Sequence, residues 1–219
     1  MPRPQRAGVP GRGQQDKLNT MLNLTPVVRN IIIMNVIVFI LQNLFSAMHV
    51  TEMLSLWNVH TENFRPYQLF TYMFVHGGFM HIFFNMLSLA FTAPILENYW
   101  GTKRFLLFYI VTGIGAGVFN IVIDYFFLDG QSFGLMMGAS GAVFGVLMGF
   151  GMMFPNMEIQ LLIPPIPIKA KYLVFVLGGM SFLLDRSGSV AHLAHLGGIV
   201  FAYAMIQYWR SQGGRGGYF

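Results

Sequence analysis

The stretch from Arg104 to Phe127, RFLLFYIVTGIGAGVFNIVIDYFF, decides the class of fold. It contains no charged residue other than Arg104 and Asp124. A hydrocarbon core of about 30 Å takes roughly 20 predominantly apolar residues per helical span. We therefore expect this stretch to cross a membrane as one helix.

The whole chain has the composition of a polytopic membrane protein. Of its 219 residues, 55% are hydrophobic and only 10% are charged, and the mean hydropathy is +0.58. Soluble domains are about 25% charged, and disordered chains combine low hydrophobicity with high net charge, so both classes are excluded. The absence of cysteine excludes disulfides, thiolate metal sites and a cysteine nucleophile. The net charge of +5 is attributed to cytoplasmic loops and not to nucleic-acid binding.

Hydropathy along the chain predicts six spans in one membrane domain, residues 26–210. The apolar stretches cover residues 30–48, 80–98, 104–127, 138–154, 171–184 and 190–209. The flanking segments are predicted to be cytoplasmic tails, disordered for residues 1–25 and flexible for residues 211–219. The first span is expected to be a retained helix and not a cleaved signal, because it is long and contains Asn35, Gln42 and Asn43. The connection from about 50 to 79 mixes aromatic and charged residues, which predicts an ordered loop at the interface.

The basic residues predict the orientation of these spans. With both termini in the cytoplasm, the lysines and arginines divide 11 to 2 in favour of that side. The outer two are Arg65 and Arg186; the inner ones are Arg3, Arg6, Arg12, Lys17, Arg29, Lys103, Arg104, Lys169, Lys171, Arg210 and Arg215. Cytoplasmic loops carry an excess of Lys and Arg, so the N-terminus is expected inside, in what we take to be the cell membrane.

Polar groups within the spans form three clusters at similar depth near the outer face: His81 with Asn85, Ser140, and His192 with His195. Polar groups in a bilayer are costly and often functional. Their common position near one face argues against a channel or transporter, which would need a polar pathway through the midplane.

Ser140 lies within Gly138-Ala139-Ser140-Gly141, at the predicted start of the fourth span. A serine there can simply bond its own helix or a neighbour. The flanking glycines and the free N–H groups of a helix N-terminus also suit a nucleophile beside an oxyanion. His195 is the candidate base, although it could instead bridge two helices. His192, one turn earlier, is given a lesser role at the water interface.

Stripes of small residues provide a reason for Ser140 and His195 to meet. Such residues recur every fourth position in the fourth span, at Gly141, Gly145 and Gly149, and in the sixth, at Ala194, Gly198 and Ala202. Stripes of this kind let membrane helices approach closely. We therefore expect the two stripes to face each other.

His81 and Asn85 are four residues apart and share one helix face. They are either a helix-bridging pair or donors to the oxyanion, joined by the N–H of Ser140. A metal site from His81, His192 and His195 is disfavoured because no HExxH motif is present. An aspartyl protease would need two carboxylates at mid-span, and Asp124 has no matching carboxylate.

From about Phe64 to Ala202 the chain resembles the rhomboid family of intramembrane serine proteases. Four ordered motifs carry this resemblance: residues 74–85 (FVHGGFMHIFFN), 96–101 (LENYWG), 138–141 (GASG) and 194–198 (AHLGG). The resemblance implies an all-α, rhomboid-like bundle of six transmembrane helices. It also places Phe144 beside the histidine, where relatives often have tyrosine, and Phe64-Arg65 where Trp-Arg is common.

The resemblance further implies a Ser140–His195 dyad without a carboxylate, with Asn85, His81 and backbone near Gly138 around the oxyanion. The expected activity is cleavage of transmembrane segments near the extracytoplasmic face, and no cofactor or metal is expected. The expected partners are the lipid bilayer and transmembrane protein substrates, with no nucleic acid; the oligomeric state is left open. The alternative is a non-proteolytic rhomboid-like protein that binds membrane helices.

Overall fold

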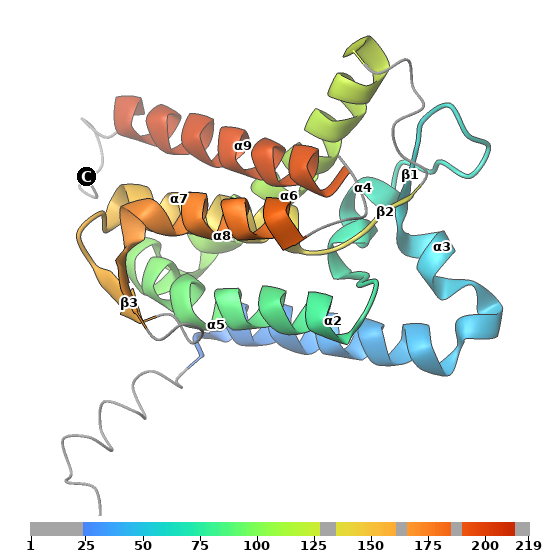
Figure 1. The fold of residues 1–219 in the computed structure, drawn as a ribbon, viewed down its shortest axis with the longest axis horizontal. Coiled ribbons are helices and arrows are strands. Elements are labelled where there is room, and N and C mark those ends of the chain that lie inside the picture. Colours follow the sequence, from blue (N-terminus) through green and yellow to red (C-terminus); the bar gives the residue numbers. More distant parts are fainter. Residues whose placement is uncertain (1–23, 128–134, 161–165, 185–189, 213–219) are drawn as a thin grey trace, which may run out of the picture.

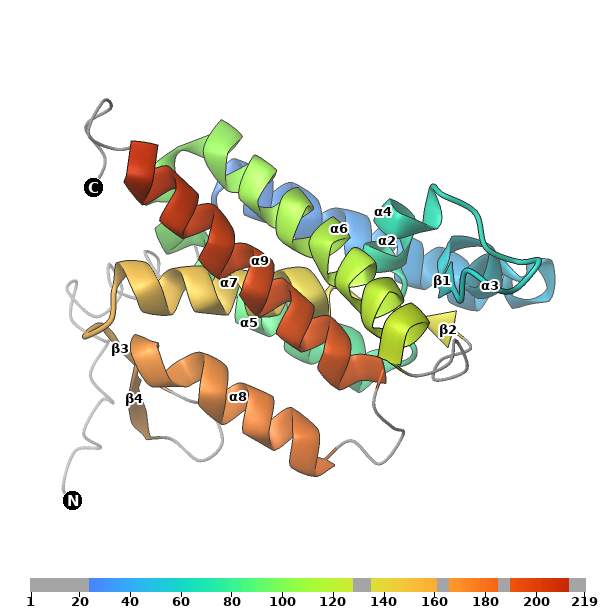
Figure 2. The same ribbon diagram turned by 90° about the horizontal axis from the view of Figure 1, so that it is seen from above.

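The computed structural model describes residues 24–127, 135–160, 166–184 and 190–212, and it is mostly helical. A helix occupies each of the six ranges predicted as spans. These helices are α2 (Pro26–Leu44), α5 (Phe79–Trp100), α6 (Thr102–Phe127), α7 (Ser140–Met153), α8 (Ala170–Leu184) and α9 (Val190–Gln212). Helix α7 lies in the middle and packs against α5, α6, α8 and α9, while α2 lies along α5 at the far side (Figures 1 and 2).

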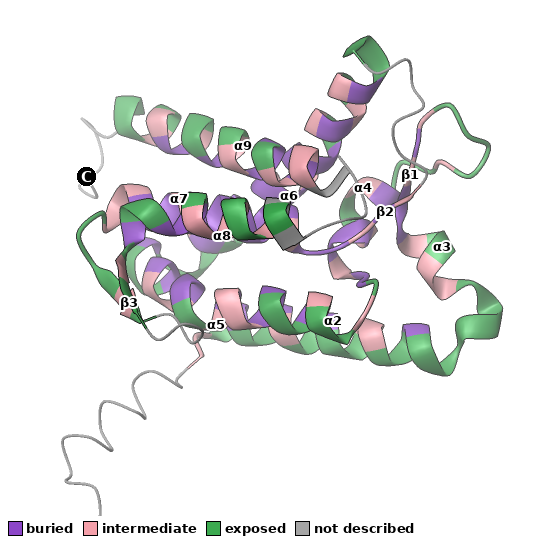
Figure 3. Cartoon of the chain, viewed as in Figure 1, coloured by how far each residue is buried: buried purple, intermediate pink, exposed green. Residues whose placement is uncertain are grey.

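The long apolar helices and the apolar side chains exposed on them identify the molecule as an integral membrane protein. Within the described residues, α2, α5 and α6 are long and apolar enough to cross a bilayer. Large apolar side chains cover their outer faces; Phe126 and Leu44, for example, are 69% and 70% exposed (Figure 3). Apolar surface of this extent on membrane-length helices is favourable in contact with lipid. Helices α7 and α8 are shorter, so the count of six spans stays a prediction.

Helix α2 begins four residues earlier than hydropathy predicted, because a distant carboxylate caps it. The buried side chain of Glu97 in α5 accepts hydrogen bonds from Val27 N at 3.1 Å and Val28 N at 3.1 Å. It also accepts one from Thr25 Oγ1 at 2.5 Å. A negative charge satisfies the unpaired N–H groups and the positive dipole end of the helix. Pro26 suits the first helical turn.

The boundaries of the two predicted tails therefore shift slightly. Thr25 is tied to the core, so it does not belong to the N-terminal tail. Helix α9 continues to Gln212, beyond the predicted start of the C-terminal tail at residue 211. The rest of these tails, 1–23 and 213–219, lies outside the described residues.

Glycines on two sides of α6 receive side chains from neighbouring segments. A Cβ added to Gly113 would overlap the side chain of Met73, and one added to Gly115 would overlap Phe201 of α9. A Cβ on Gly117 would lie 3.2 Å from both Leu56 and Tyr72. Glycine therefore lets α6 hold the outer connection on one side and α9 on the other.

The predicted contact between the two small-residue stripes is correct at one end only. A Cβ on Gly198 would overlap the carbonyl oxygen of Gly141, so backbone meets backbone where α9 crosses α7. Gly145 and Gly149 instead face α6, where an added Cβ would lie 2.7 Å from Thr112 and 3.0 Å from Phe108. The expectation that all three glycines of α7 face α9 was wrong, because α6 packs against the lower part of the same face.

The connection from residue 45 to 78, which we call the outer loop, is ordered as predicted. It contains η1 (Ser46–Met48), α3 (Val50–Leu54), β1 (Leu56–Trp57), α4 (Gln68–Thr71) and η2 (Tyr72–Phe74). Buried Asn58 fastens it to α6 by donating a hydrogen bond to Asp124 at 2.8 Å. Asp124 thus has a role in packing that the sequence did not suggest.

Two short ribbons were not predicted from the sequence. Strand β1 pairs antiparallel with β2 (Leu135–Met136), which leads directly into α7. The other pair, β3 (Glu158–Gln160) with β4 (Pro167–Lys169), joins α7 to α8 at the opposite end. The β1–β2 ribbon therefore ties the outer loop to the segment before Ser140 (Figure 1).

Replacing Gly198 by valine should destabilise the protein by about 3 kcal/mol or more, because the carbonyl of Gly141 cannot move away as a flexible side chain would. Gly179→Val in α8 is the matched control, since a Cβ there meets nothing within 4 Å. Thermal unfolding in detergent measures both. A Gly198→Val variant as stable as Gly179→Val would show that the two helices do not touch there.

Candidate active site

Ser140 is the first residue of α7. The preceding residue, Ala139, accepts the first intrahelical bond, from Val143 N at 2.9 Å. The N–H groups of the first helical turn have no partner within the helix, and the dipole makes this end partially positive. Ser140 therefore lies where the backbone can stabilise an anion, as its place in the sequence predicted.

His195 comes from α9, on the side of that helix that faces α7. Its ring stacks on Phe144, with ring centroids 4.1 Å apart and an interplanar angle of 20°. Phe144 is four residues after Ser140 and hence on the same face of α7. The ring contact expected at Phe144 is confirmed. Helices α7 and α9, which carry Ser140 and His195, run side by side and touch at Gly141 and Gly198 (Figure 2).

His81 approaches the site from α5, beside Gly138. A Cβ on Gly138 would lie only 2.6 Å from His81 Nε2, and the φ of Gly138 is +118°, which L side chains rarely adopt. On the other side of the ring, Gly77 N–H donates to His81 Nδ1 at 3.4 Å. Because Nδ1 accepts, Nε2 is the protonated nitrogen and acts as a donor on the side facing Gly138.

Asn85 is buried one turn further along α5. Its Nδ2 donates to the backbone carbonyl of His81 at 3.0 Å, which fixes the orientation of the amide. An amide group carries two N–H donors, so this bond uses one of them. Asn85 and His81 share one face of α5, as their spacing predicted.

The backbone N–H of Gly138 is not directed to the site. It donates to the carbonyl of Tyr72 at 2.9 Å, so this one amide is already paired, and a part for other backbone near Gly138 around the oxyanion stays a prediction. Gly138 contributes by its missing side chain, which lets His81 come close. Hydrogen bonding between the outer loop and residue 138 could not be seen from sequence spacing.

Tyr72 itself was missed by the sequence-based prediction. It is fully buried in η2, and its hydroxyl donates to the Gly113 carbonyl of α6 at 2.6 Å. Burial raises the pKa of Tyr72 well above its ordinary value, so the hydroxyl remains a neutral donor. Its backbone and side chain together connect Gly138 to α6. The only signal in the sequence was its position shortly before the 74–85 motif.

Two further histidines, His192 and His76, lie beside residues of this site. His192 is edge-on to His195, with ring centroids 6.4 Å apart. Among the described residues, no three His, Cys, Asp or Glu side chains gather closely enough to hold a metal ion. His76 was part of a quoted motif but was given no role, although it is buried next to Ala139.

With this geometry in view, comparison with known proteins identifies the family. The model of the Rhomboid domain matches residues 63–212, which includes all the residues just described. The chain belongs to the rhomboid family. This is a family of intramembrane proteases, and the resemblance inferred from the sequence motifs is therefore correct.

Individual relatives differ in how much of their length this rhomboid matches. The protein named "Putative rhomboid protease YdcA" from Bacillus subtilis is 29% identical over 88% of this chain and 94% of its own length. "Rhomboid protein 1, mitochondrial" from Saccharomyces cerevisiae is 33% identical over 57% of this chain but only 36% of its own length. "Inactive RHOMBOID-like protein 8" from Arabidopsis thaliana is 23% identical over 66% of the chain. Membership of the family alone therefore does not establish activity.

Gly138→Ala should destabilise this rhomboid by about 1–3 kcal/mol, because alanine is strained at a φ of +118° and its Cβ would press on His81. Gly78→Ala is the control, since the backbone there is extended and a Cβ meets nothing within 4 Å. Thermal unfolding in detergent compares the two variants. Equal midpoints would mean that His81 does not lie against Gly138.

Proposed function

We propose that this rhomboid is an intramembrane serine endopeptidase that cleaves transmembrane segments near the extracytoplasmic face. Ser140 is the nucleophile and His195 the general base. Oxyanion stabilisation comes from the N–H of Ser140, His81 and Asn85, with Gly138 giving His81 its room. No cofactor or metal takes part in the proposed reaction.

The observation that carries this proposal is the crossing of α7 and α9. Backbone contact at Gly141 and Gly198 brings α9 against the first turn of α7. One turn after Ser140, the ring of Phe144 stacks on His195 and holds it in that crossing. Acyl transfer requires a hydroxyl, a base and oxyanion donors around one point. In this proposal α7 provides the hydroxyl, α9 the base and α5 the side-chain donors to the oxyanion.

In the first step, neutral His195 removes the proton of Ser140 as the hydroxyl oxygen attacks a peptide carbonyl. The carbonyl oxygen becomes negative and is stabilised by the N–H of Ser140 and by donors from His81 and Asn85. The protonated His195 then gives its proton to the leaving amine as the C–N bond breaks. In the second half, His195 deprotonates a water that hydrolyses the acyl-enzyme and restores Ser140.

The length of α7 supports attack within the membrane but close to water. Its 14 residues make a helix of about 21 Å, which is shorter than a hydrocarbon core of about 30 Å. Ser140 at its N-terminus would thus lie below the outer surface, under the ribbon of β1 and β2. A substrate helix hides its carbonyls in backbone hydrogen bonds, so segments with small or helix-breaking residues should be preferred.

We further propose that both termini face the cytoplasm, in the cell membrane, on the basis of the 11 to 2 division of basic residues. Reporter fusions after Lys103 and after Lys171 should report the cytoplasm. Fusions at Asp129 and at Ser187 should report the other side. A cytoplasmic signal at Asp129 or an external one at Lys103 would contradict this orientation.

Ser140→Ala and His195→Ala should each reduce cleavage of a single-span model substrate by several orders of magnitude, because each removes a part of one catalytic unit. The double variant should be little worse than either alone. Asn85→Ala should lose less, about 10²–10³-fold, since other oxyanion donors remain. Cleavage is measured with purified protein in detergent, with circular dichroism and thermal unfolding as controls for folding.

A fluorophosphonate probe separates the two functional alternatives. It should label the wild type at Ser140 and should not label Ser140→Ala. If Ser140→Ala retained full cleavage in protein free of other proteases, the serine mechanism would be wrong. If the wild type neither cleaved nor was labelled, binding of membrane helices without proteolysis would become the better proposal.

A further inference from the structure

The segment that presents Ser140 is held by the outer loop through two successive backbone amides. Gly138 N–H donates to the Tyr72 carbonyl at 2.9 Å, and Ala139 N–H donates to the ring nitrogen Nε2 of His76 at 3.5 Å. The next amide along the chain is that of Ser140, at the start of α7. The N–H groups of Gly138 and Ala139 are thus directed into the protein. The N–H of Ser140 is one of those at the start of a helix that have no partner within the helix.

His76 is well suited to accept this bond. It is 2% exposed and lies before α5, and its Nδ1 is 3.4 Å from the carbonyl oxygen of Phe74. With the proton on Nδ1 donated to that carbonyl, Nε2 carries the lone pair that faces Ala139. Burial, and next the neighbouring His81, lower the pKa of His76 from 6.5 to about 3. The ring therefore stays neutral and able to accept at ordinary pH.

The same ring also contacts the second histidine of the site. The rings of His76 and His81 meet edge to face with centroids 5.0 Å apart. His76 thus contacts both the loop before Ser140 and the imidazole that faces Gly138. A displacement of its ring would move two sides of the site together.

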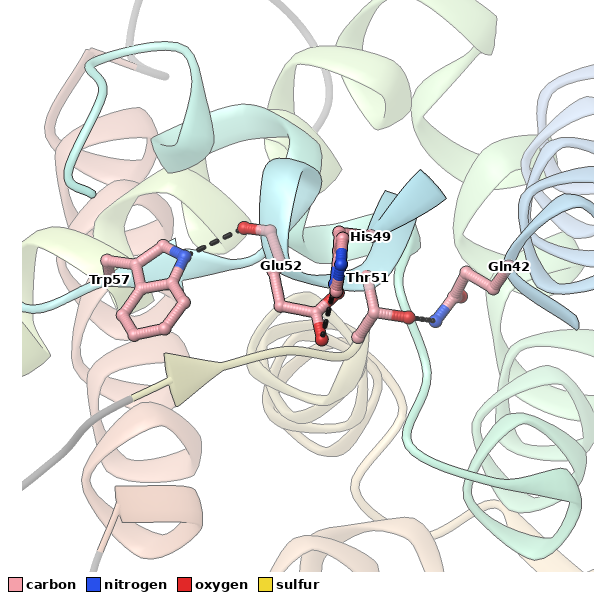
Figure 4. A network of polar contacts seen from close by, with 5 residues as sticks. All are labelled: Gln42, His49, Thr51, Glu52 and Trp57. Atoms are coloured by element: carbon pink, nitrogen blue, oxygen red, sulfur yellow. Dashed lines mark hydrogen bonds and ion pairs between the residues drawn. The ribbon is translucent and has the colours of Figure 1, made fainter. Parts of the chain in front are cut away.

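The backbone of His76 is itself clamped by Gln42 near the end of α2. Gln42 Oε1 accepts from His76 N at 3.0 Å, and Gln42 Nε2 donates to His76 O at 3.3 Å. The same Nε2 donates to Thr51 Oγ1 at 3.0 Å, a contact drawn in Figure 4. Gln42 is buried, at 6% exposure, and its amide lies on the side of α2 that faces the protein, near the end of a helix whose opposite side is exposed. Helix α2 thereby reaches the site through one side chain.

We propose that His76, clamped by Gln42, is a positioning residue that fixes the backbone of Gly138 to Ser140 and the ring of His81 for the reaction. His76 does not touch the reacting atoms and acts through these neighbours. The proposal rests on the proposed function of Ser140. It predicts that loss of the acceptor nitrogen of His76 loosens the segment before α7 and slows the chemical step without weakening substrate binding.

Three variants and a control test this role in the full chain in detergent. His76→Phe keeps a ring of similar size but removes the acceptor, whereas His76→Gln keeps a side-chain acceptor. Gln42→Met removes both bonds to the His76 backbone without touching residues 138–140. His60→Phe is the control, because His60 is an exposed histidine of the same loop whose stacking on Tyr125 a phenylalanine ring can keep.

Two kinetic measurements report on position. For a fluorescent single-span model substrate, His76→Phe should lower kcat by about tenfold to a hundredfold with KM within about twofold, since small misplacements of reacting groups have effects of this size. Fluorophosphonate labelling of Ser140 should slow in the same proportion. His76→Gln should recover most of the loss, Gln42→Met should slow both rates, and His60→Phe should match the wild type.

Hydrogen exchange provides a readout that does not depend on activity. Amide exchange in a peptide covering residues 135–141 should be about tenfold faster in His76→Phe than in the wild type, because one hydrogen bond is lost. Exchange along α6 should not change. If the wild type were inactive, the proposed function would fail, while faster exchange at 135–141 would still support the anchoring by His76.

Two outcomes would overturn the proposal. One is a His76→Phe variant with wild-type exchange at residues 135–141, or with wild-type turnover and labelling. The other is a loss of turnover that only follows the loss of folded protein and that His76→Gln does not restore, which would mean a purely structural role. If His76→Phe does not fold, unchanged exchange and labelling in Gln42→Met would contradict the proposal in the same way.

Discussion

The backbone contact between Gly141 and Gly198 is the constraint on which the site depends. A methyl group on Gly198 would overlap the carbonyl of Gly141, so α7 and α9 cross with no side chain between them. This crossing sets His195 against Phe144, one turn beyond Ser140. In a bilayer no hydrophobic force drives helices together, and close packing of small residues takes its place. The position of the histidine is thus fixed by two glycines that carry no chemistry.

Around this crossing, the outer loop acts as a scaffold for the residues before Ser140. The β1–β2 ribbon holds residues 135 and 136, and Tyr72 and His76 hold the amides of Gly138 and Ala139. The loop is in turn fastened to α6 by Asn58 and to α2 by Gln42. Each attachment is a polar bond shielded from lipid, where an unpaired group would be costly. The loop therefore fixes the backbone that leads into Ser140.

The sequence predicted the helical ranges and supplied the candidate groups of the site because both depend on local properties of the chain. Length and apolarity located the six helical ranges to within four residues, and the GASG and AHLGG motifs singled out Ser140 and His195 as candidates. The failures concern long-range pairing. The start of α2 depends on Glu97, some 70 residues away. The face of α7 that carries Gly145 packs against α6 and not against α9. Neither can be read from the periodicity of a single helix.

His76 shows the same limit at the site itself. In the sequence it is one of two histidines in a short motif, and spacing alone favours His81, which has Asn85 one turn away. Only the fold shows that His76 turns its acceptor nitrogen to Ala139 and that Gln42 holds its backbone. Because His81 is fixed as a donor by Gly77 and His76 as an acceptor by Phe74, the two rings have opposite roles. One ring offers a proton beside Gly138, and the other fixes the backbone that carries Ser140.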